Sequence, residues 1–485
     1  MNNKLFEGSI TKLIFKLSIP MILAQLVNLL YNMVDRMFIG NIEEVGLIAI
    51  GGVGACFPII ILISAFSALF GMGGAPLVAI SLGKGDIDGG NRILNTSFIM
   101  LLLSSAIIIP IMLFFKEQIL LAFGANETNL PYASSYITIY IIGTPLVMLS
   151  LGLNQYIVAQ GKSLFAMLSI VIGAVMNIVL DPIFISVFNL GVSGAALATI
   201  ISQGFSALFI ILFLISKKSI LKINPFKNKI QGKIIKAIVM LGLSPFIMQS
   251  TEALVQIVFN TQIKHYILDP TQETLYLSAM TIMISIMSLI NMPMQGLAQG
   301  TQTLISQNYG AGYIDRAKSA SRKLIMFALI YSFVFVTILM IFPTPFVKIF
   351  NSDPKLLELC TKLIRIFFIG MAFMGIQIAC QNSFLALGKS KISLILALLR
   401  KIILLIPLAF ILPTLFGQMG IFVAECSADI LAISITLICY LVLFSKYLNA
   451  SNPNNNNHNE PIKEKKNKYK KFIYKKNRKP VIKDL

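Results

Sequence analysis

The chain is poor in the residues on which most metal-binding and disulfide-rich proteins depend. It has no tryptophan, two histidines and five cysteines among 485 residues. Two histidines exclude a multi-histidine metal centre. The cysteines show no CxxC motif and fall mostly in apolar runs. We therefore expect small apolar side chains rather than disulfides or metal ligands at Cys56, Cys360, Cys380, Cys426 and Cys439.

Charge is also scarce, and negative charge most of all. Charged residues make up 12% of the chain, and 20 acidic residues face 40 basic ones. The basic residues lie in the connections between apolar runs and in the tail, which predicts contact with a lipid bilayer and argues against nucleic acid. The first apolar run is too long for a cleavable signal peptide and lacks a small-residue cleavage site.

What the chain has in abundance is long apolar stretches. Hydrophobic residues reach 56%, with a mean hydropathy of +0.82. A membrane-spanning helix needs roughly 20 apolar residues. The sequence therefore predicts an all-α polytopic membrane protein with twelve spans, at about 13–38, 49–80, 93–115, 132–158, 163–187, 192–216, 236–265, 275–306, 320–343, 357–386, 391–413 and 418–446. The second and eighth are long and contain glycine and proline, so we expect them to be tilted or bent.

Lysine and arginine gather in alternate connections, for example Lys217, Lys218 and Lys222 between spans six and seven. Such connections usually face the cytoplasm. We therefore expect both termini in the cytoplasm of a bacterial cell, at its inner membrane. The tail contains an asparagine run followed by many lysines. We expect it to be disordered and loosely held to anionic lipid, or else to bind a partner or a regulator.

The two halves of the chain repeat each other at an offset of 227 residues. Gly73 matches Gly300, Gly143 matches Gly370, and Gly161-Lys162-Ser163 matches Gly388-Lys389-Ser390. Six spans per copy give a parallel repeat, which predicts two six-helix lobes around a central cavity, as in secondary transporters. The expected domains are 1–220, 221–447 and the tail 448–485.

Neither glycine-lysine-serine triplet completes a phosphate-binding loop. The glycine required five positions earlier is Tyr156 in one copy and Ser383 in the other. No nucleophile and base pattern is present, and so we expect neither an enzyme nor an organic cofactor. Energy for transport should then come from an ion gradient.

Several polar residues interrupt the spans of the first half at similar depth. An ionisable group inside a membrane is expensive, so Asp35 and Asp181 are candidate functional residues. Asn177 lies one helical turn before Asp181, and Thr199 and Tyr136 are expected at the same level. Two nearby carboxylates cannot both ionise cheaply, so this cluster can take up a proton, or its oxygens can bind Na⁺. Interhelical hydrogen bonding is the alternative.

The second half carries a different set of embedded charges. Glu425 and Asp429 share a helix face, and Arg400 reaches a similar depth, which predicts a structural ion pair of Arg400 with one of them. Glu252 shows no cationic partner in the sequence, so it is a candidate site for a cationic substrate or a second coupling ion. Met292 and Gln295, beside an expected helix break at Pro293, are further candidate substrate contacts.

These features together resemble the multidrug and toxic compound extrusion (MATE) family over about residues 10–447. The resemblance rests on the duplicated spans, Asp35 fifteen residues after Pro20 in the LSIP opening, and NIVLDPIF followed by GVSGAALATIIS. It implies two lobes in a V shape, acting as a monomer, that export organic cations in exchange for H⁺ or Na⁺. It also implies a coupling site formed by Asp35, Tyr136, Asn154, Asn177, Asp181 and Thr199, with Pro20 as the bending point.

Another branch of that family uses acids in spans seven and ten. Glu252 matches the first, but span ten offers only Gln377, Gln381 and Asn382. The incomplete pair favours coupling in the first lobe. An alternative function is a lipid-linked precursor flippase of the related polysaccharide-exporter type, whose cavity should be lined by arginine and lysine. A channel or membrane enzyme is a third possibility, without a motif to support it.

Overall fold

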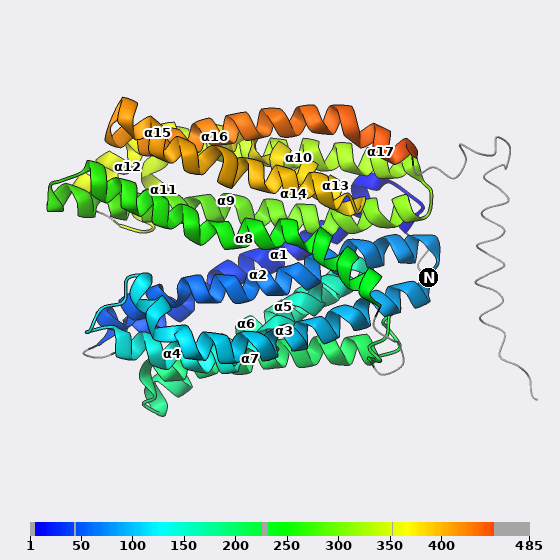
Figure 1. The fold of residues 1–485 in the computed structure, drawn as a ribbon, viewed down its shortest axis with the longest axis horizontal. Helices are drawn as coiled ribbons and strands as arrows, with labels where there is room; N and C mark the ends of the chain where they lie inside the picture. The colour runs from blue at the N-terminus through cyan, green and yellow to red at the C-terminus, as the bar shows by residue number, and fades with distance from the viewer. Residues whose placement is uncertain (1–4, 43–44, 226–230, 352, 451–485) are drawn as a thin grey trace, which may run out of the picture.

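A computed structural model describes residues 5–42, 45–225, 231–351 and 353–450. Ten helices in this part are long and apolar enough to cross a membrane, and two bent helix pairs complete twelve spans. All of them run nearly parallel in one bundle (Figure 1), and α1 begins at the same end at which α17 finishes. The predicted all-α fold with twelve spans is confirmed. The expected disordered tail lies outside the described residues from Ser451 on.

The first half of the chain forms six spans in order. Its elements are α1 (Ile10–Gly40), α2 (Gly46–Lys84), α3 (Ile87–Ala122), α4 (Leu130–Ile142), α5 (Thr144–Ala159), α6 (Ser163–Pro182) with the π-helical turn η2 (Ile183–Val187), and α7 (Gly191–Ile215).

The second half repeats this order with more irregular turns. Its elements are α8 (Gly232–Tyr266), α9 (Pro270–Gly310), α10 (Ile314–Ile341), α11 (Pro343–Lys348), α12 (Pro354–Phe367), the 3₁₀ turn η3 (Gly370–Phe373), α13 (Met374–Ala386), α14 (Ser390–Leu398), the π-helical η4 (Leu399–Leu405), α15 (Ile406–Phe416), α16 (Gln418–Cys439), the π-helical η5 (Tyr440–Phe444) and α17 (Ser445–Ala450).

Spans four and ten are the broken ones. The chain bends by 58° between α4 and α5 and by 48° between α12 and the helical segment at 370–386. The two breaks fall at Gly143 and just before Gly370, which the repeat pairs. In the first, Pro145 lies two residues after Gly143, so glycine flexibility is combined with a missing backbone donor. The helix break expected at Pro293 is not present, because α9 continues through it and a lone proline removes only one helical hydrogen bond. Helix α2 also continues without a break. The expected tilt or bend of spans two and eight stays a prediction.

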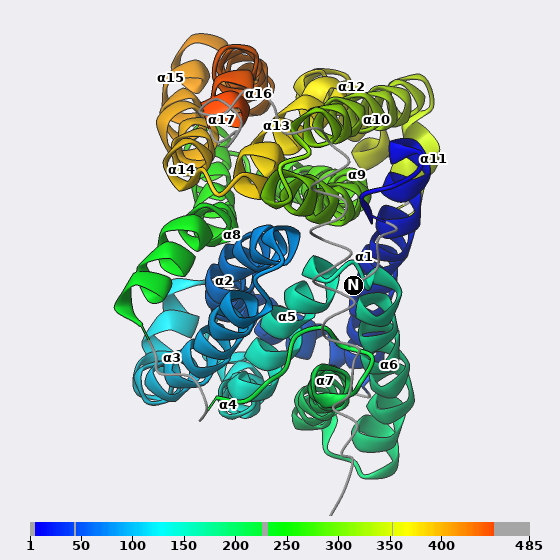
Figure 2. The ribbon, with the colours of Figure 1, turned by 90° about the vertical axis from the view of Figure 1, so that its right-hand side faces the viewer.

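Two separate hydrophobic cores correspond to the two halves, but α1 and α8 each contribute to both. Leu13, Ile14 and Leu17 of α1 pack in the core of the second half, whereas Met21 and Ile39 pack in the core of the first. Helix α8 crosses in the opposite sense, since Ile238 belongs to the first core and Phe259 to the second. The crossing lies close to Pro20 in α1 and between Phe246 and Val255, after Pro245, in α8. Figure 2 shows α1 and α8 on opposite sides of the junction.

The described residues bring the two lobes into contact at glycines and polar groups, and these contacts lie toward one end of the bundle. Ser18 of α1 donates to the carbonyl of Leu297 in α9 at 3.0 Å, and Gln307 of α9 donates to the carbonyl of Ala159 at 2.8 Å. Gly73 of α2 faces Gly242 of α8 without room for a side chain. Small residues allow such close helix packing. These residues lie in the halves of their helices that are nearer the basic connections.

Gly83 and Gly310 occupy equivalent positions in the two copies of the repeat, and each packs closely against the backbone of the other lobe. A β-carbon on Gly83 would lie 2.2 Å from the carbonyl oxygen of Gln307, and one on Gly310 would lie 2.2 Å from that of Ile80. We predict that Gly83→Ala forces the lobes apart at this end, because neither backbone can yield without moving its helix. The measurement is the distance distribution between spin labels on α2 and α9. The control is Gly54→Ala in the same helix, where nothing lies within 4 Å of the added carbon. Unchanged distances in Gly83→Ala would refute the contact.

Candidate functional site

The core of the candidate site is a polar triad at the α6–α7 contact. The Asn177 side-chain amide donates to the Asp181 carboxylate at 3.0 Å and to the Thr199 hydroxyl at 3.5 Å. Asn177 and Asp181 are one turn apart on α6, so both face α7. All three residues are buried, Asp181 completely. The amide therefore orients the Asp181 carboxylate within the lobe.

Asp35 and Tyr136 approach this triad from two other helices. The Asp35 carboxylate on α1 lies within electrostatic range of Asp181 and of the Tyr136 hydroxyl, and the buried Tyr136 of α4 lies close to Thr199. The adjacent Arg36 places its guanidinium 4.8 Å from the centre of the Phe57 ring, and no ion pair of the described residues joins it to Asp35. The structure thus brings together the five residues whose shared depth the sequence predicted: Asp35, Tyr136, Asn177, Asp181 and Thr199.

Three oxygens in this cluster are buried and have no hydrogen-bond partner among the described residues. They are Oδ1 of Asp35, Oδ1 of Asn177 and Oδ2 of Asp181. Buried acceptors without a donor are costly, and buried unpaired charges more so. A proton on one carboxylate, or a hard cation shared by the oxygens, satisfies this demand. In the described residues no group of three or more His, Cys, Asp or Glu side chains forms a metal site, so a bound cation here would rely on amide and hydroxyl oxygens.

Asn154 does not join the cluster. Its amide donates to the carbonyl of Ala166 at 2.9 Å and to the Ser169 hydroxyl at 2.6 Å, which ties α5 to α6. Ser169 is eight residues before Asn177, or about 12 Å along the helix. The placement of Asn154 in the coupling site is therefore wrong, and its role is to hold two helices together.

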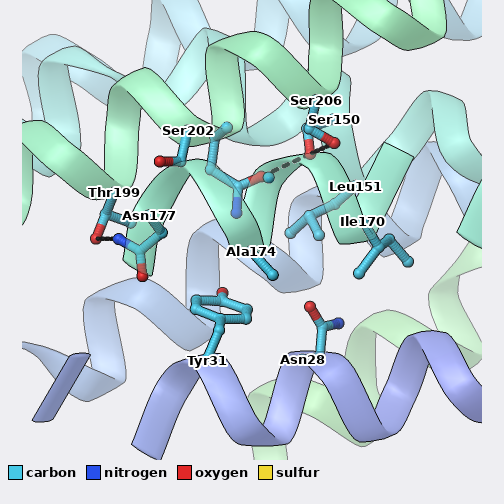
Figure 3. Close-up of a pocket in the computed structure, with 12 residues that line it drawn as sticks. Asn28, Tyr31, Ser150, Leu151, Ile170, Ala174, Asn177, Thr199, Ser202 and Ser206 are labelled. Atoms are coloured by element: carbon cyan, nitrogen blue, oxygen red, sulfur yellow. Dashed lines mark hydrogen bonds between the residues drawn. The ribbon is translucent and has the colours of Figure 1, made fainter. Parts of the chain in front are cut away.

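A small polar pocket adjoins the cluster and contains residues that the sequence reasoning missed. It has a volume of about 20 Å³, enough for a water molecule, between α1, α5, α6 and α7. Figure 3 shows Tyr31 and Asn28 of α1 facing Asn177, Ala174 and Ser150 across it. Tyr31 is one turn before Asp35, so their shared face of α1 could have been inferred from the spacing. On the far side Ser150 donates to Gln203 at 2.6 Å.

The second lobe holds the predicted ion pair in a larger form. Arg400 Nε donates to Asp429 Oδ1 at 2.6 Å and Arg400 Nη2 to Glu425 Oε1 at 3.0 Å, so the guanidinium binds both acids rather than one. All three side chains are buried. A guanidinium suits this arrangement because its donors form a fixed fork.

Glu252 is not unpaired, which corrects the prediction. Its carboxylate forms an ion pair with Lys401, whose side chain is only 4% exposed while that of Glu252 is 48% exposed. Lys401 could not be found from the sequence, because neighbouring residues of a regular helix point about 100° apart. Arg400 and Lys401 were therefore not expected to bind acids of the same cluster. The π-helical turn η4 carries both residues, and such turns often occur at functional positions.

Gln295 and Met292 remain isolated candidates. Gln295 is exposed and Met292 half-buried on the continuous helix α9, and no contact given by the described residues joins either to Glu252. The five cysteines are free thiols, four of them buried, as expected of small apolar residues.

The buried Arg400 group yields a stability prediction. Arg400→Met should lower the free energy of unfolding by about 3–5 kcal/mol, because two buried carboxylates lose their only guanidinium. Thermal unfolding of the detergent-solubilised protein measures this. Lys362→Met is the control, since Lys362 and Glu358 form an exposed pair on one helix face and its loss should change little. Equal effects of the two substitutions would contradict the structural role of Arg400.

Comparison with known proteins places this geometry among transporters. A family model described as MatE matches residues 20–183 and 246–411. The two matched segments correspond to the two copies of the repeat, and together they cover more than half of the chain.

Curated relatives match over almost their whole length. The chain is 26% identical over 441 residues to a multidrug export protein, MepA, of Staphylococcus haemolyticus, covering 91% of this chain and 94% of the relative. It is 26% identical over 439 residues to MepA of Staphylococcus aureus strain NCTC 8325, covering 90% and 95%.

A solved structure shares the fold. The outward-facing conformation of a multidrug resistance MATE family transporter of the MOP superfamily superposes with a TM-score of 0.84 and 24% identity, over 92% of this chain and 98% of that one.

Proposed function

The chain belongs to the MatE family, and from that premise we propose that it exports chemically varied organic compounds across a bacterial cell membrane. The MepA relatives carry the name multidrug export protein and align over at least 90% of this chain. The fold supports the same activity, because two lobes joined at one end can open alternately to either side. The chain is a multi-pass membrane protein, and we propose that it works as a monomer with both termini in the cytoplasm.

The basic connections support that orientation. Arg316 donates to the carbonyl of Gly8 at 3.1 Å, and Leu5 packs against Gly161 beside Lys162, so several basic connections gather where α1 begins. Lysine and arginine favour the cytoplasmic side. On this reading the lobes are closed toward the cytoplasm and open outward.

We propose that substrates are organic cations and that the coupling ion, H⁺ or Na⁺, binds at Asp35 and Asp181. The observation that carries this proposal is the set of buried, partnerless oxygens around two neighbouring carboxylates. A flippase for polyanionic head groups would instead need free basic side chains. The buried cations Arg400 and Lys401 are both neutralised by carboxylates.

The coupling site has a direct test in energised cells. Asp35→Asn or Asp181→Asn should reduce efflux of a fluorescent organic cation to the level of cells without the protein, because a carboxamide cannot take up and release the ion. Glu117→Gln, at an exposed carboxylate of α3, is the matched control and should pump normally. Replacing Na⁺ by K⁺ at a constant pH gradient distinguishes the two ions. Wild-type efflux in both aspartate variants would exclude this site.

Pro20 offers a second test, of movement rather than binding. It interrupts the hydrogen bonding of α1 at the point where the helix passes from one core to the other. Pro20→Ala should restore that bond and stiffen α1, so turnover falls while the substrate dissociation constant stays the same. Pro110→Ala in α3 is the matched proline control. A cross-link that prevents α1 from bending yet leaves transport intact would rule out bending there.

A further inference from the structure

The second lobe contains a connected group of five charges that the proposed coupling site does not use. Arg400 binds Glu425 and Asp429, Lys401 binds Glu252, and Glu425 lies within electrostatic range of both Lys401 and Glu252. We name this set the carboxy-lobe network. Three carboxylates against two cations leave one excess negative charge. Glu425 and Asp429 are the buried acids of the set, and there an uncompensated charge is costly, whereas Glu252 is half-exposed.

The excess charge coincides with two oxygens that lack a donor. Oε2 of Glu425 and Oδ2 of Asp429 are buried and have no hydrogen-bond partner among the described residues. The two acids are one turn apart on α16, and the same guanidinium holds the other oxygen of each. One further positive charge placed between them satisfies both oxygens and neutralises the network.

The packing indicates which cation fits. A β-carbon on Gly370 would lie 2.6 Å from the β-carbon of Asp429, so the bend of span ten packs closely against this acid and leaves no room for a side chain there. A metal cation needs about six oxygen ligands, but the site offers two free ones. A proton needs only one oxygen and, once bound, donates to the second.

The internal repeat relates this network to the first lobe. Because Ala198 matches Ala424, Glu425 takes the position of Thr199 and Asp429 that of Gln203. Thr199 belongs to the proposed coupling cluster, and Gln203 lines the adjoining pocket. The two lobes thus place polar groups at equivalent positions, and in the second lobe these are acids.

We propose that the carboxy-lobe network is a second proton-binding site, with one proton shared between Glu425 and Asp429. Glu252, which is half-exposed and bonded to the buried Lys401, is the route by which protons from water reach it. The charged groups facing the site are Arg400 and Lys401 from η4 and Glu252 from α8, and the thiol of Cys426 lies beside it on α16. The proposal extends the proposed antiport, in which this proton is a second coupling ion.

Infrared spectroscopy of the purified protein tests the site without measuring transport. The starting protein carries Asp35→Asn and Asp181→Asn, in Na⁺-free buffer near pH 7, so that the first-lobe acids do not contribute. We expect the carbonyl band of one protonated carboxylic acid, because exposed acids are ionised at this pH. Adding Glu425→Gln or Asp429→Asn should remove the band, since either change cancels the excess charge, whereas adding Glu117→Gln should leave it.

Two outcomes would overturn the proposal. One is the absence of the band from the starting protein. This outcome can be measured even if the further variants do not fold. The other is its persistence after both Glu425→Gln and Asp429→Asn. Wild-type efflux in the Asp35 and Asp181 variants would overturn the proposed coupling site alone, so the two proposals can fail separately.

Discussion

The organising constraint of this structure is the cost of a carboxylate inside a membrane protein. Such a group must be paired, neutralised or functional. The two lobes meet this constraint differently. The first lobe places Asp35 and Asp181 near each other with no ion-pair partner among the described residues, whereas the second surrounds its acids with Arg400 and Lys401. The carboxylates of the first lobe thus lack the protein cations that the acids of the second lobe have.

The crossing of α1 links that electrostatic demand to the contact between lobes. The first turns of α1 pack against α9 in the second lobe, and Ser18 bonds Leu297 there. The later turns carry Tyr31 and Asp35 into the first lobe. Helix α1 is therefore anchored in both lobes, with Pro20 between the two anchors. If the proposed ion binds at Asp35, it binds on the helix that also takes part in the contact between the lobes.

Much of the fold could be predicted from the sequence, because the spans follow from the length of the apolar runs and the two lobes follow from the fixed repeat offset. The twelve spans and the glycines paired by the repeat are where they were expected. The helix break expected at Pro293 was misplaced because a proline was taken as the breaking signal. Pro293 is accommodated within α9. The breaks in spans four and ten lie instead at Gly143 and just before Gly370.

The part of the candidate site that could be predicted from the sequence is the set of polar residues that lie at the same depth in different spans. Asp35, Asn177, Asp181, Thr199 and Tyr136 converge as predicted, because depth along a regular helix can be counted. Asn154 was assigned to the cluster only through the family resemblance, and in the structure it bonds Ser169 instead. The pair of Lys401 with Glu252 escaped detection because the π-helical turn η4 alters the direction of side chains.

The most direct measurement of the central claim is ion flux through the purified protein in sealed vesicles. An imposed gradient of an organic cation should drive H⁺ or Na⁺ across the membrane in the opposite direction. The account predicts that this counterflow is lost in Asp35→Asn and retained in Glu117→Gln. Counterflow of the same size in Asp35→Asn and in the wild-type protein would contradict it.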